Sequence, residues 1–340
     1  MYHTILRKRI REKGLLHSAM LELTYRCNLD CFFCYNDKNA AGAPLVFEDY
    51  LHLFDDLASM QTLFLTFTGG EPMTHPRFFD LGVAARERGF AVRLRTNGHS
   101  LRPAVAARVQ AEIDPVLIEM SLHGACAATH ERQTRAPGSF SRLIANIRGM
   151  KALGLPMNLV STLTRWNETE LDAMFALADA LEVRLRFQGP VGPRDNGDLS
   201  PMCIQPSAAG WARLQELIAQ RAAAPPENAP PQTGEDLAVA RPTSEAKPYH
   251  CGVGSEEVHI DPFGNVSPCL HLRWPIGNLR EQSITQIWQH SPVLEQARQL
   301  AAHTARRWAG GQKPMQFGAP LFCPGVALKT GSRLVESSST

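Results

Sequence analysis

Short runs of apolar and β-branched residues alternate along the chain with longer segments whose apolar residues recur at helical spacing. The short runs predict strands, and the longer segments predict helices. The expected strands are residues 19–24, 62–68, 91–96, 116–122, 157–163 and 183–187. The expected helices are residues 47–60, 76–89, 101–112, 139–153 and 168–181. Short connections between these elements favour parallel strands joined by right-handed crossovers, so we expect an α/β fold.

The six expected strand-and-helix units are fewer than the eight that a closed (β/α)8 barrel requires. We therefore expect a partial (β/α)6 barrel with parallel strands and a wide lateral opening. In parallel sheets of this kind, the loops at the carboxyl ends of the strands form the functional site.

The pattern changes after residue 200. Residues 206–224 read as a helix, and a stretch rich in proline and polar residues follows it. Residues 258–266 alternate apolar and polar side chains around an Asp-Pro-Phe-Gly-Asn turn, which predicts a β-hairpin, and a short helix follows near residue 284. The expected segments are 1–16, a basic N-terminal arm; 17–200, the partial barrel; 201–248, a bridging helix and Pro-rich linker; 249–330, a small C-terminal unit; and 331–340, a flexible tail.

The composition excludes several classes of protein. With 340 residues, 44% hydrophobic and 20% charged, the chain is an ordinary globular protein. A net charge of +2 gives no electrostatic reason to expect nucleic acid or an anionic membrane as a partner. No apolar run is long enough to cross a bilayer, and the basic N-terminus lacks the apolar core of a signal peptide. We therefore expect a cytoplasmic protein, in which eight cysteines favour metal ligation over disulfides.

Three cysteines lie within eight residues directly after the first expected strand: Cys27, Cys31 and Cys34. A four-iron, four-sulfur cluster takes one thiolate per iron, so three cysteines leave the fourth iron open to another ligand. Zinc is the alternative, but it requires a fourth ligand in a paired spacing. The nearest candidates, His52 and His75, fit no such spacing.

Three further motifs fall where the next three strands end: Gly69-Gly70-Glu71-Pro72, Thr96-Asn97-Gly98 and Ser121-Leu122-His123-Gly124. Each has an ordinary structural interpretation. The glycines suit a turn or a close approach of the backbone to a ligand, and Asn-Gly is typical of a turn. His123 is either a hydrogen-bonded structural residue or a residue that faces a substrate.

The spacing Cys-x3-Cys-x2-Cys, with Phe33 before the last cysteine, resembles the signature of radical S-adenosylmethionine (radical SAM) enzymes. The resemblance implies that the open iron binds the amino and carboxylate groups of S-adenosylmethionine (SAM), which the reduced cluster cleaves to methionine and a 5′-deoxyadenosyl radical. It also implies the following contacts with SAM: Gly69, Gly70, Glu71 and Pro72 near the amino group, Asn97 and Ser121 near the ribose, and Arg186 or Arg184 at the carboxylate. By the same resemblance, His123 faces the substrate and acts in catalysis.

The C-terminal unit carries a second set of cysteines. The spacing Cys251-x12-Gly264-x4-Cys269 resembles the start of the SPASM and twitch domains, which hold auxiliary clusters in radical SAM maturases. A full SPASM domain has further cysteines, and of these only Cys323 is present. The resemblance implies one auxiliary iron–sulfur cluster on Cys251, Cys269 and Cys323. Its fourth ligand is open, and the candidates are His250, His259, substrate and Cys203; a degenerate domain that holds zinc or nothing is the alternative.

The resemblance implies a radical SAM enzyme, and a ribosomally made peptide is its first expected substrate. A tetrapyrrole or a carbohydrate intermediate is the second, and a non-catalytic iron–sulfur or zinc scaffold is an alternative of another class. We expect an electron donor such as flavodoxin or ferredoxin. A separate leader-peptide recognition protein is also expected, because residues 1–16 are too few for a recognition domain. Cys126 lies beyond both cysteine sets, either as an ordinary buried thiol or as a hydrogen-atom donor.

Overall fold

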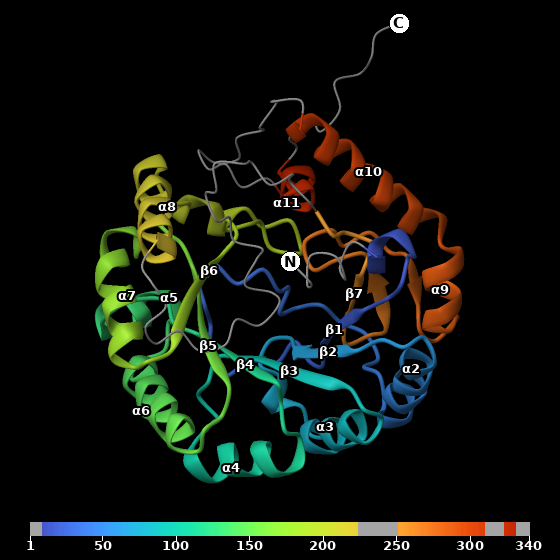
Figure 1. The fold of residues 1–340 in the computed structure, drawn as a ribbon, viewed down its shortest axis with the longest axis horizontal. Coiled ribbons are helices and arrows are strands. Elements are labelled where there is room, and N and C mark those ends of the chain that lie inside the picture. The colour runs from blue at the N-terminus through green and yellow to red at the C-terminus, as the bar shows by residue number, and fades with distance from the viewer. Residues whose placement is uncertain (1–8, 224–250, 310–322, 331–340) are drawn as a thin grey trace, which may run out of the picture.

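The computed structural model describes residues 9–223, 251–309 and 323–330. In these residues the strands form one nine-stranded sheet in the order β6-β5-β4-β3-β2-β1-β7-β8-β9 (Figure 1). The expected linker beyond residue 223, the expected tail over 331–340 and the candidate ligand His250 lie outside the described residues.

The strands are β1 (Ser18–Glu22), β2 (Phe64–Thr68), β3 (Ala91–Thr96), β4 (Leu117–Ser121), β5 (Met157–Thr162), β6 (Arg184–Gln188), β7 (Glu257–Ile260), β8 (Asn265–Ser267) and β9 (Gly277–Asn278). The α-helices are α2 (Phe47–Ser59), α3 (Phe78–Glu87), α4 (Pro103–Glu112), α5 (Ala127–Thr134), α6 (Ser139–Ala152), α7 (Leu171–Ala180), α8 (Ala208–Ala223), α9 (Ile284–His290), α10 (Pro292–Ala309) and α11 (Pro324–Lys329). Three short 3-10 helices are η1 (Pro72–Thr74), η2 (Glu168–Glu170) and η3 (Ser200–Ile204).

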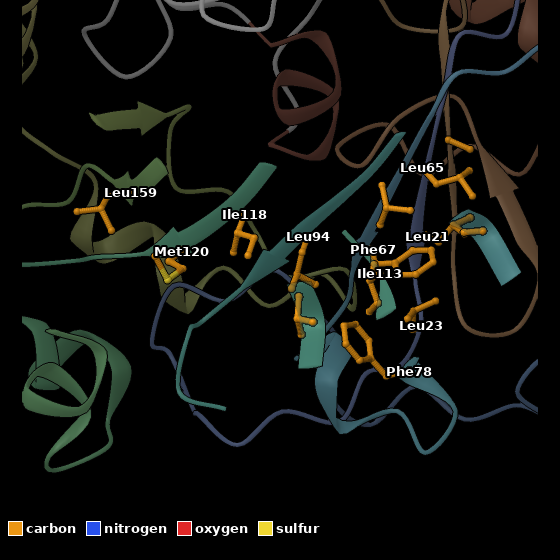
Figure 2. Close-up of a cluster of buried hydrophobic side chains, with 14 of the residues drawn as sticks. Leu21, Leu23, Leu65, Phe67, Phe78, Leu94, Ile113, Ile118, Met120 and Leu159 are labelled. Carbon is orange, nitrogen blue, oxygen red and sulfur yellow. The ribbon is translucent and has the colours of Figure 1, made fainter. Parts of the chain in front are cut away.

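Strands β1 to β6 pair in parallel in the order of the chain, which confirms the partial (β/α)6 barrel. The curved sheet lines the inside, and α2, α3, α4, α6 and α7 cover its outer face from one end to the other (Figure 1). Apolar side chains from the strands meet those of the helices on that outer face, as the labelled residues of Figure 2 show. Burial of this apolar layer is the main stabilising contribution to the fold.

The strand register places polar residues on the opposite, inner face. Arg95 pairs with Glu119 across β3 and β4, and Asn158 pairs with Arg184 across β5 and β6. Because side chains alternate along a strand, the apolar and polar faces separate cleanly. The inside of the partial barrel therefore has a charged lining.

The C-terminal hairpin forms as expected, with β7 and β8 antiparallel and α9 after them. In addition, β7 pairs in parallel with β1, so that the hairpin continues the barrel sheet beyond its first strand. The C-terminal unit is thus joined to the barrel by backbone hydrogen bonds.

The sequence pattern missed helix α5, because the buried side chains on this helix are polar: His130, Gln133 and Thr134. A method that follows apolar periodicity does not detect such a helix.

Residues 9–16, part of the expected N-terminal arm, pack against the C-terminal unit. Ile10 and Leu16 are buried, and Arg11 forms an ion pair of 3.0 Å with Glu256. Among the described residues, none of the helices is both long and apolar enough to span a bilayer.

Candidate active site

The cysteine loop, residues 23–46, leaves the carboxyl end of β1 and carries the first set of cysteines. Two neighbouring segments hold its backbone. The Phe32 N–H donates to the carbonyl of Gln133 in α5 at 2.9 Å. Arg194, in the loop after β6, donates to the carbonyls of Cys34 at 2.6 Å and Phe32 at 2.9 Å. The loop is therefore fixed from both sides where its thiols gather.

Burial raises the pKa of the Cys27, Cys31 and Cys34 thiols. The charges of Cys34 and Cys27 raise the pKa of Cys31 further, so the three sulfurs lie near one another. Among the described residues, no three His, Cys, Asp or Glu side chains gather closely enough to hold a single metal ion. The donor set, three thiols brought together on one loop, fits an iron–sulfur cluster with one open iron.

Gly69 and Gly70 follow β2 and lie against the start of the cysteine loop. A Cβ atom on Gly69 would lie 2.4 Å from the Thr24 carbonyl oxygen, and one on Gly70 would lie 2.4 Å from that of Arg26. The N–H groups of Gly70 and Glu71 donate to these same two carbonyls at 2.7 and 2.8 Å. Both glycines are therefore required by the packing of two backbone segments, and their contact with SAM stays a prediction.

The Glu71 carboxylate is fully buried, and three donors surround it. The Thr96 hydroxyl and the Asn97 N–H each donate at 2.8 Å, and the Met73 N–H donates at 3.2 Å. Burial raises the pKa of Glu71 to about 7, although these hydrogen bonds lower it. Glu71 thus joins the carboxyl ends of β2 and β3, just before Pro72 starts η1, and its contact with SAM stays a prediction.

The Asn97 side chain lies against the cysteine loop. Its Nδ2 donates to Asn28 Oδ1 at 2.6 Å and lies 3.8 Å from Cys27 Sγ. The Leu29 N–H donates to the same sulfur at 3.4 Å. Hydrogen bonds to cysteine sulfurs tune the potential of an iron–sulfur cluster, so Asn97 is placed to act on a cluster held by Cys27. Its contact with the ribose of SAM stays a prediction.

Ser121 is the last residue of β4 and His123 follows it, so the motif lies at the end of this strand as expected. Ser121 is half-buried, whereas the His123 ring is buried and contacts the ring of Phe33 edge to face, with 4.7 Å between centroids. Burial, together with the neighbouring His130, lowers the pKa of His123 to about 3, so its imidazole is neutral at physiological pH. The ring therefore supports the cysteine loop by packing against Phe33. A contact of His123 with the substrate stays a prediction.

Arg186 lies on the inner face of β6 and forms an ion pair with Glu119 of β4. Glu119 also pairs with Arg95 at 2.6 Å. Although burial raises the pKa of Glu119, the two arginines lower it below its usual value. The Arg186 guanidinium thus has a protein partner. Binding of the SAM carboxylate by Arg186 or by Arg184 stays a prediction.

The second set of cysteines also converges. Burial, Cys323 and Cys251 all raise the pKa of Cys269, to about 12. Helix α11, which begins after Cys323, packs tightly on the segment after Cys269, because a Cβ atom on Gly325 would lie 2.7 Å from the backbone of His271. Cys251 and Cys269 also pack against the same small apolar cluster. The three thiols therefore lie in one region of the C-terminal unit, and this donor set fits an auxiliary iron–sulfur cluster.

Two candidates for the fourth ligand are described. His259 is fully buried, and both of its ring nitrogens have partners, Glu22 at 3.1 Å and the Ser267 hydroxyl at 3.0 Å. The histidine could bind iron only by giving up one of these contacts. Cys203 is exposed on η3, and Cys126, the lone thiol beyond both sets, is exposed at the start of α5.

A charged cluster that no sequence motif predicted connects the two cysteine sets. Glu22 accepts hydrogen bonds of 2.9 Å from the Tyr35 hydroxyl and from Arg273 Nη1. Asp195 in turn pairs with Arg273 and with Lys329 of α11. The one available signal was a glutamate at the end of an otherwise apolar strand, where a charge is costly unless it is paired.

Two family models match the chain. That of the radical SAM superfamily matches residues 21–178, and that of the SPASM iron–sulfur cluster-binding domain matches residues 251–310. Mycofactocin maturase MftC of Mycobacterium ulcerans is 30% identical over 297 residues, 82% of this chain and 76% of that protein. The PqqA peptide cyclase of Ruegeria pomeroyi is 30% identical over 286 residues, 79% and 73% of the two chains. The AdoMet-dependent heme synthase of Methanosarcina barkeri is 28% identical over 291 residues, 82% and 83% of the two chains.

Solved structures share the fold. Streptococcus suis SuiB bound to precursor peptide SuiA superposes with a TM-score of 0.65 at 15% identity, covering 86% of this chain and 69% of that one. The enzyme anSMEcpe with bound AdoMet gives 0.62 at 15% identity, covering 84% and 83%.

The chain belongs to the radical SAM superfamily, and its C-terminal unit is a SPASM domain. It is therefore an enzyme whose cofactors are SAM, a four-iron, four-sulfur cluster and an auxiliary iron–sulfur cluster. These predictions from the sequence are confirmed. The SPASM match ends before Cys323, so the role of that cysteine as a cluster ligand stays a prediction.

Proposed function

We propose that this enzyme matures a ribosomally made peptide. The observation that carries the proposal is the likeness of this enzyme to mycofactocin maturase and PqqA peptide cyclase. Each of the two is 30% identical to this chain over more than three quarters of this chain's length. Both matches run through the barrel and into the SPASM domain. The fold is also that of SuiB, which has been solved with a precursor peptide bound.

In this proposal the Cys27, Cys31 and Cys34 thiolates hold the first cluster, with Phe33 packed between them and His123. SAM binds at the carboxyl ends of β2, β3 and β4, against the backbone of residues 69–72 and the side chains of Asn97 and Ser121. Arg186, released in part from Glu119, is the candidate for the SAM carboxylate. When bound, the cluster and SAM supply a 5′-deoxyadenosyl radical that abstracts a hydrogen atom from the peptide.

The chain orients the reactants and keeps water away from them. Anchored from two sides, the cysteine loop fixes the reacting centre at one edge of the sheet. Fixing two reactants in contact removes much of the entropic barrier to their reaction. Cys251, Cys269 and Cys323 would hold the auxiliary cluster, which would supply an acceptor for an electron from the substrate. A flavodoxin or ferredoxin supplies the electron for SAM cleavage, and a separate protein presents the peptide leader.

Anaerobic reconstitution, with measurement of iron, sulfide and 5′-deoxyadenosine, tests the chemistry. The wild type should bind about eight irons and a Cys251/Cys269/Cys323 triple alanine variant about four, as two clusters and one cluster require. Cys27→Ala should form no 5′-deoxyadenosine. A reduced, cluster-loaded and SAM-saturated wild type that forms none would contradict radical SAM activity.

A second set of assays tests the substrate. Peptides encoded beside the gene are incubated with the reconstituted enzyme, SAM and dithionite, and their masses are followed. A change in peptide mass that matches the 5′-deoxyadenosine formed supports the proposal.

A tetrapyrrole is the second candidate, because the Methanosarcina barkeri heme synthase is 28% identical over 83% of its own length. The charged inner face of the barrel, with Arg95, Arg184 and Arg186, is compatible with substrate carboxylates. Turnover of an iron porphyrin bearing propionates, with no change in any peptide, would favour this candidate over the first.

A further inference from the structure

Two adjacent residues in the loop after β6 contact different parts of the molecule. Arg194 donates to carbonyls of the cysteine loop. The Asp195 carboxylate faces the C-terminal unit, 2.9 Å from Arg273 Nη2 and 2.6 Å from Lys329 Nζ. The Asp195 N–H also donates to the carbonyl of Tyr35 at 2.8 Å. This loop therefore touches both cysteine-bearing parts of the chain.

The two cations that Asp195 holds come from segments that carry auxiliary cysteines. Arg273 follows Cys269 closely, and Lys329 ends the helix that begins after Cys323. A single carboxylate thus restrains two of the three segments on which the auxiliary cysteines lie.

Arg273 makes a second contact, on the barrel side. Its Nη1 lies 2.9 Å from a carboxylate oxygen of Glu22, at the carboxyl end of β1. Glu22 also accepts the hydroxyl of Tyr35, the residue directly after Cys34. The Glu22 side chain is fully buried, and those of Arg273 and Asp195 are 18% and 16% exposed. Removing one partner of a buried ion pair leaves an uncompensated charge and strongly destabilises the protein. These contacts therefore favour the one arrangement of the two segments in which every charge is paired.

We propose that Asp195 and Arg273 are positioning residues that fix the auxiliary cysteine set relative to the cysteine set that binds the first cluster. The Arg273 fork reaches Glu22 and Asp195 at once, which a lysine ammonium on the same backbone cannot do with equal geometry. The ion pairs therefore set the separation of the two clusters and the width of the space between them.

The first test measures the thiols of the apoprotein. Asp195→Asn and Arg273→Lys are compared with wild type and with Asp172→Asn, which breaks an exposed ion pair with Arg213 at a distance from both cysteine sets. Each reduced protein is alkylated with iodoacetamide, and every cysteine is followed by mass spectrometry. Alkylation of Cys269 and Cys323 should be at least about tenfold faster in the two test variants, because Asp195→Asn removes one partner of a buried pair and the lysine of Arg273→Lys does not reach Glu22 and Asp195 at once. Cys31 and the Asp172→Asn variant should keep wild-type rates.

The second test measures the spectroscopic interaction of the two clusters. The reconstituted and reduced proteins are compared by electron paramagnetic resonance, in which two nearby clusters broaden and split each other's signals. The interaction should change in Asp195→Asn and Arg273→Lys and stay unchanged in Asp172→Asn. A role limited to general stability would lower the melting temperature without changing this interaction. Asp195→Glu, which keeps the carboxylate, should restore much of the wild-type spectrum.

Wild-type alkylation rates in both test variants overturn the proposal, as does an unchanged interaction between the clusters. Equal effects in Asp172→Asn also overturn it, since they would show a general loosening. Neither measurement uses a substrate, so the outcome is independent of whether the enzyme acts on a peptide.

Discussion

The N–H of Asn97 donates a hydrogen bond of 2.8 Å to the buried carboxylate of Glu71. This bond joins the loop after β3 to the loop after β2, and the Asn97 side chain continues the connection to Cys27. The family resemblance placed the first motif near the amino group of SAM and the second near its ribose. The structure shows that they form one unit with the first cysteine, so a change at Glu71 should reach the cluster through Asn97.

Glu71 should make the stability of the apoprotein fall as the pH rises. Its pKa is raised from 4.5 to about 7 in the folded chain, so the folded state binds a proton that the unfolded state has already lost. Stability from this group is therefore full below pH 4.5 and declines up to about pH 7. Between these values, the free energy of unfolding of wild type relative to Glu71→Gln should fall by about 3 kcal/mol.

Urea unfolding of both apoproteins at several pH values measures this difference. Subtracting the variant removes the contributions of the titrating groups that the two proteins share. A difference that does not depend on pH would mean that the Glu71 carboxylate keeps an ordinary pKa in the fold.

Asn97→Ala should lower the reduction potential of the first cluster and slow SAM cleavage. The Asn97 Nδ2 lies 3.8 Å from Cys27 Sγ, and a donor near a cluster sulfur stabilises the more negative, reduced state. Loss of a hydrogen bond to a charged group costs about 1.5–3 kcal/mol, which corresponds to a rate about tenfold lower or more. A redox titration followed by electron paramagnetic resonance measures the potential.

Asn28→Ala is the matched control for this experiment. It removes the partner of Asn97 at 2.6 Å and leaves the amide near Cys27 in place. The shift in potential should therefore be smaller than in Asn97→Ala. Equal shifts would assign the effect to the position of the loop, and no shift in either variant would remove Asn97 from the tuning of the cluster.

The barrel could be predicted from the sequence because local pattern determines its parts. Each of β1 to β6 overlaps an apolar or β-branched run, and β3, residues 91–96, was placed without error. The first cysteine set was also found from local information, since its three ligands lie within eight residues of one loop.

Contacts between distant parts of the chain could not be predicted in this way. The pairing of β7 with β1 joins residues more than 230 positions apart, and neither strand carries a local sign of its neighbour. Likewise, Arg186 was chosen for its charge on the last barrel strand, whereas its partner Glu119 lies across β5. The three donors around Glu71 could not be predicted either, because only the folded loops bring them together.

His123→Phe should keep SAM cleavage near the wild-type rate, whereas His123→Ala should slow it. The imidazole is neutral, buried and packed edge to face on Phe33, so a ring of similar size preserves the support of the cysteine loop. Removing the ring leaves a cavity that costs about 2–5 kcal/mol. Formation of 5′-deoxyadenosine without substrate, together with the melting temperature, measures both effects. Loss of cleavage in the stable His123→Phe protein would instead show that the imidazole nitrogens are required.

Arg194→Met should loosen the cysteine loop. The guanidinium holds the Cys34 carbonyl at 2.6 Å and the Phe32 carbonyl at 2.9 Å, and each bond from a charged donor contributes about 1.5–3 kcal/mol. Iodoacetamide should therefore alkylate Cys31 and Cys34 of the variant apoprotein faster than those of wild type. The reconstituted variant should also lose iron faster than wild type on gel filtration.

Two controls separate this effect from a loss of surface charge. Asp198→Asn removes the carboxylate that pairs with Arg194 at 3.1 Å and leaves both carbonyl contacts in place, so it should behave almost as wild type. Arg194→Lys keeps the charge but offers a point donor in place of a planar fork, so its rates should fall between those of wild type and Arg194→Met. If lysine restored wild-type alkylation and iron retention completely, charge alone would explain the role of Arg194, and the paired carbonyl contacts would be dispensable.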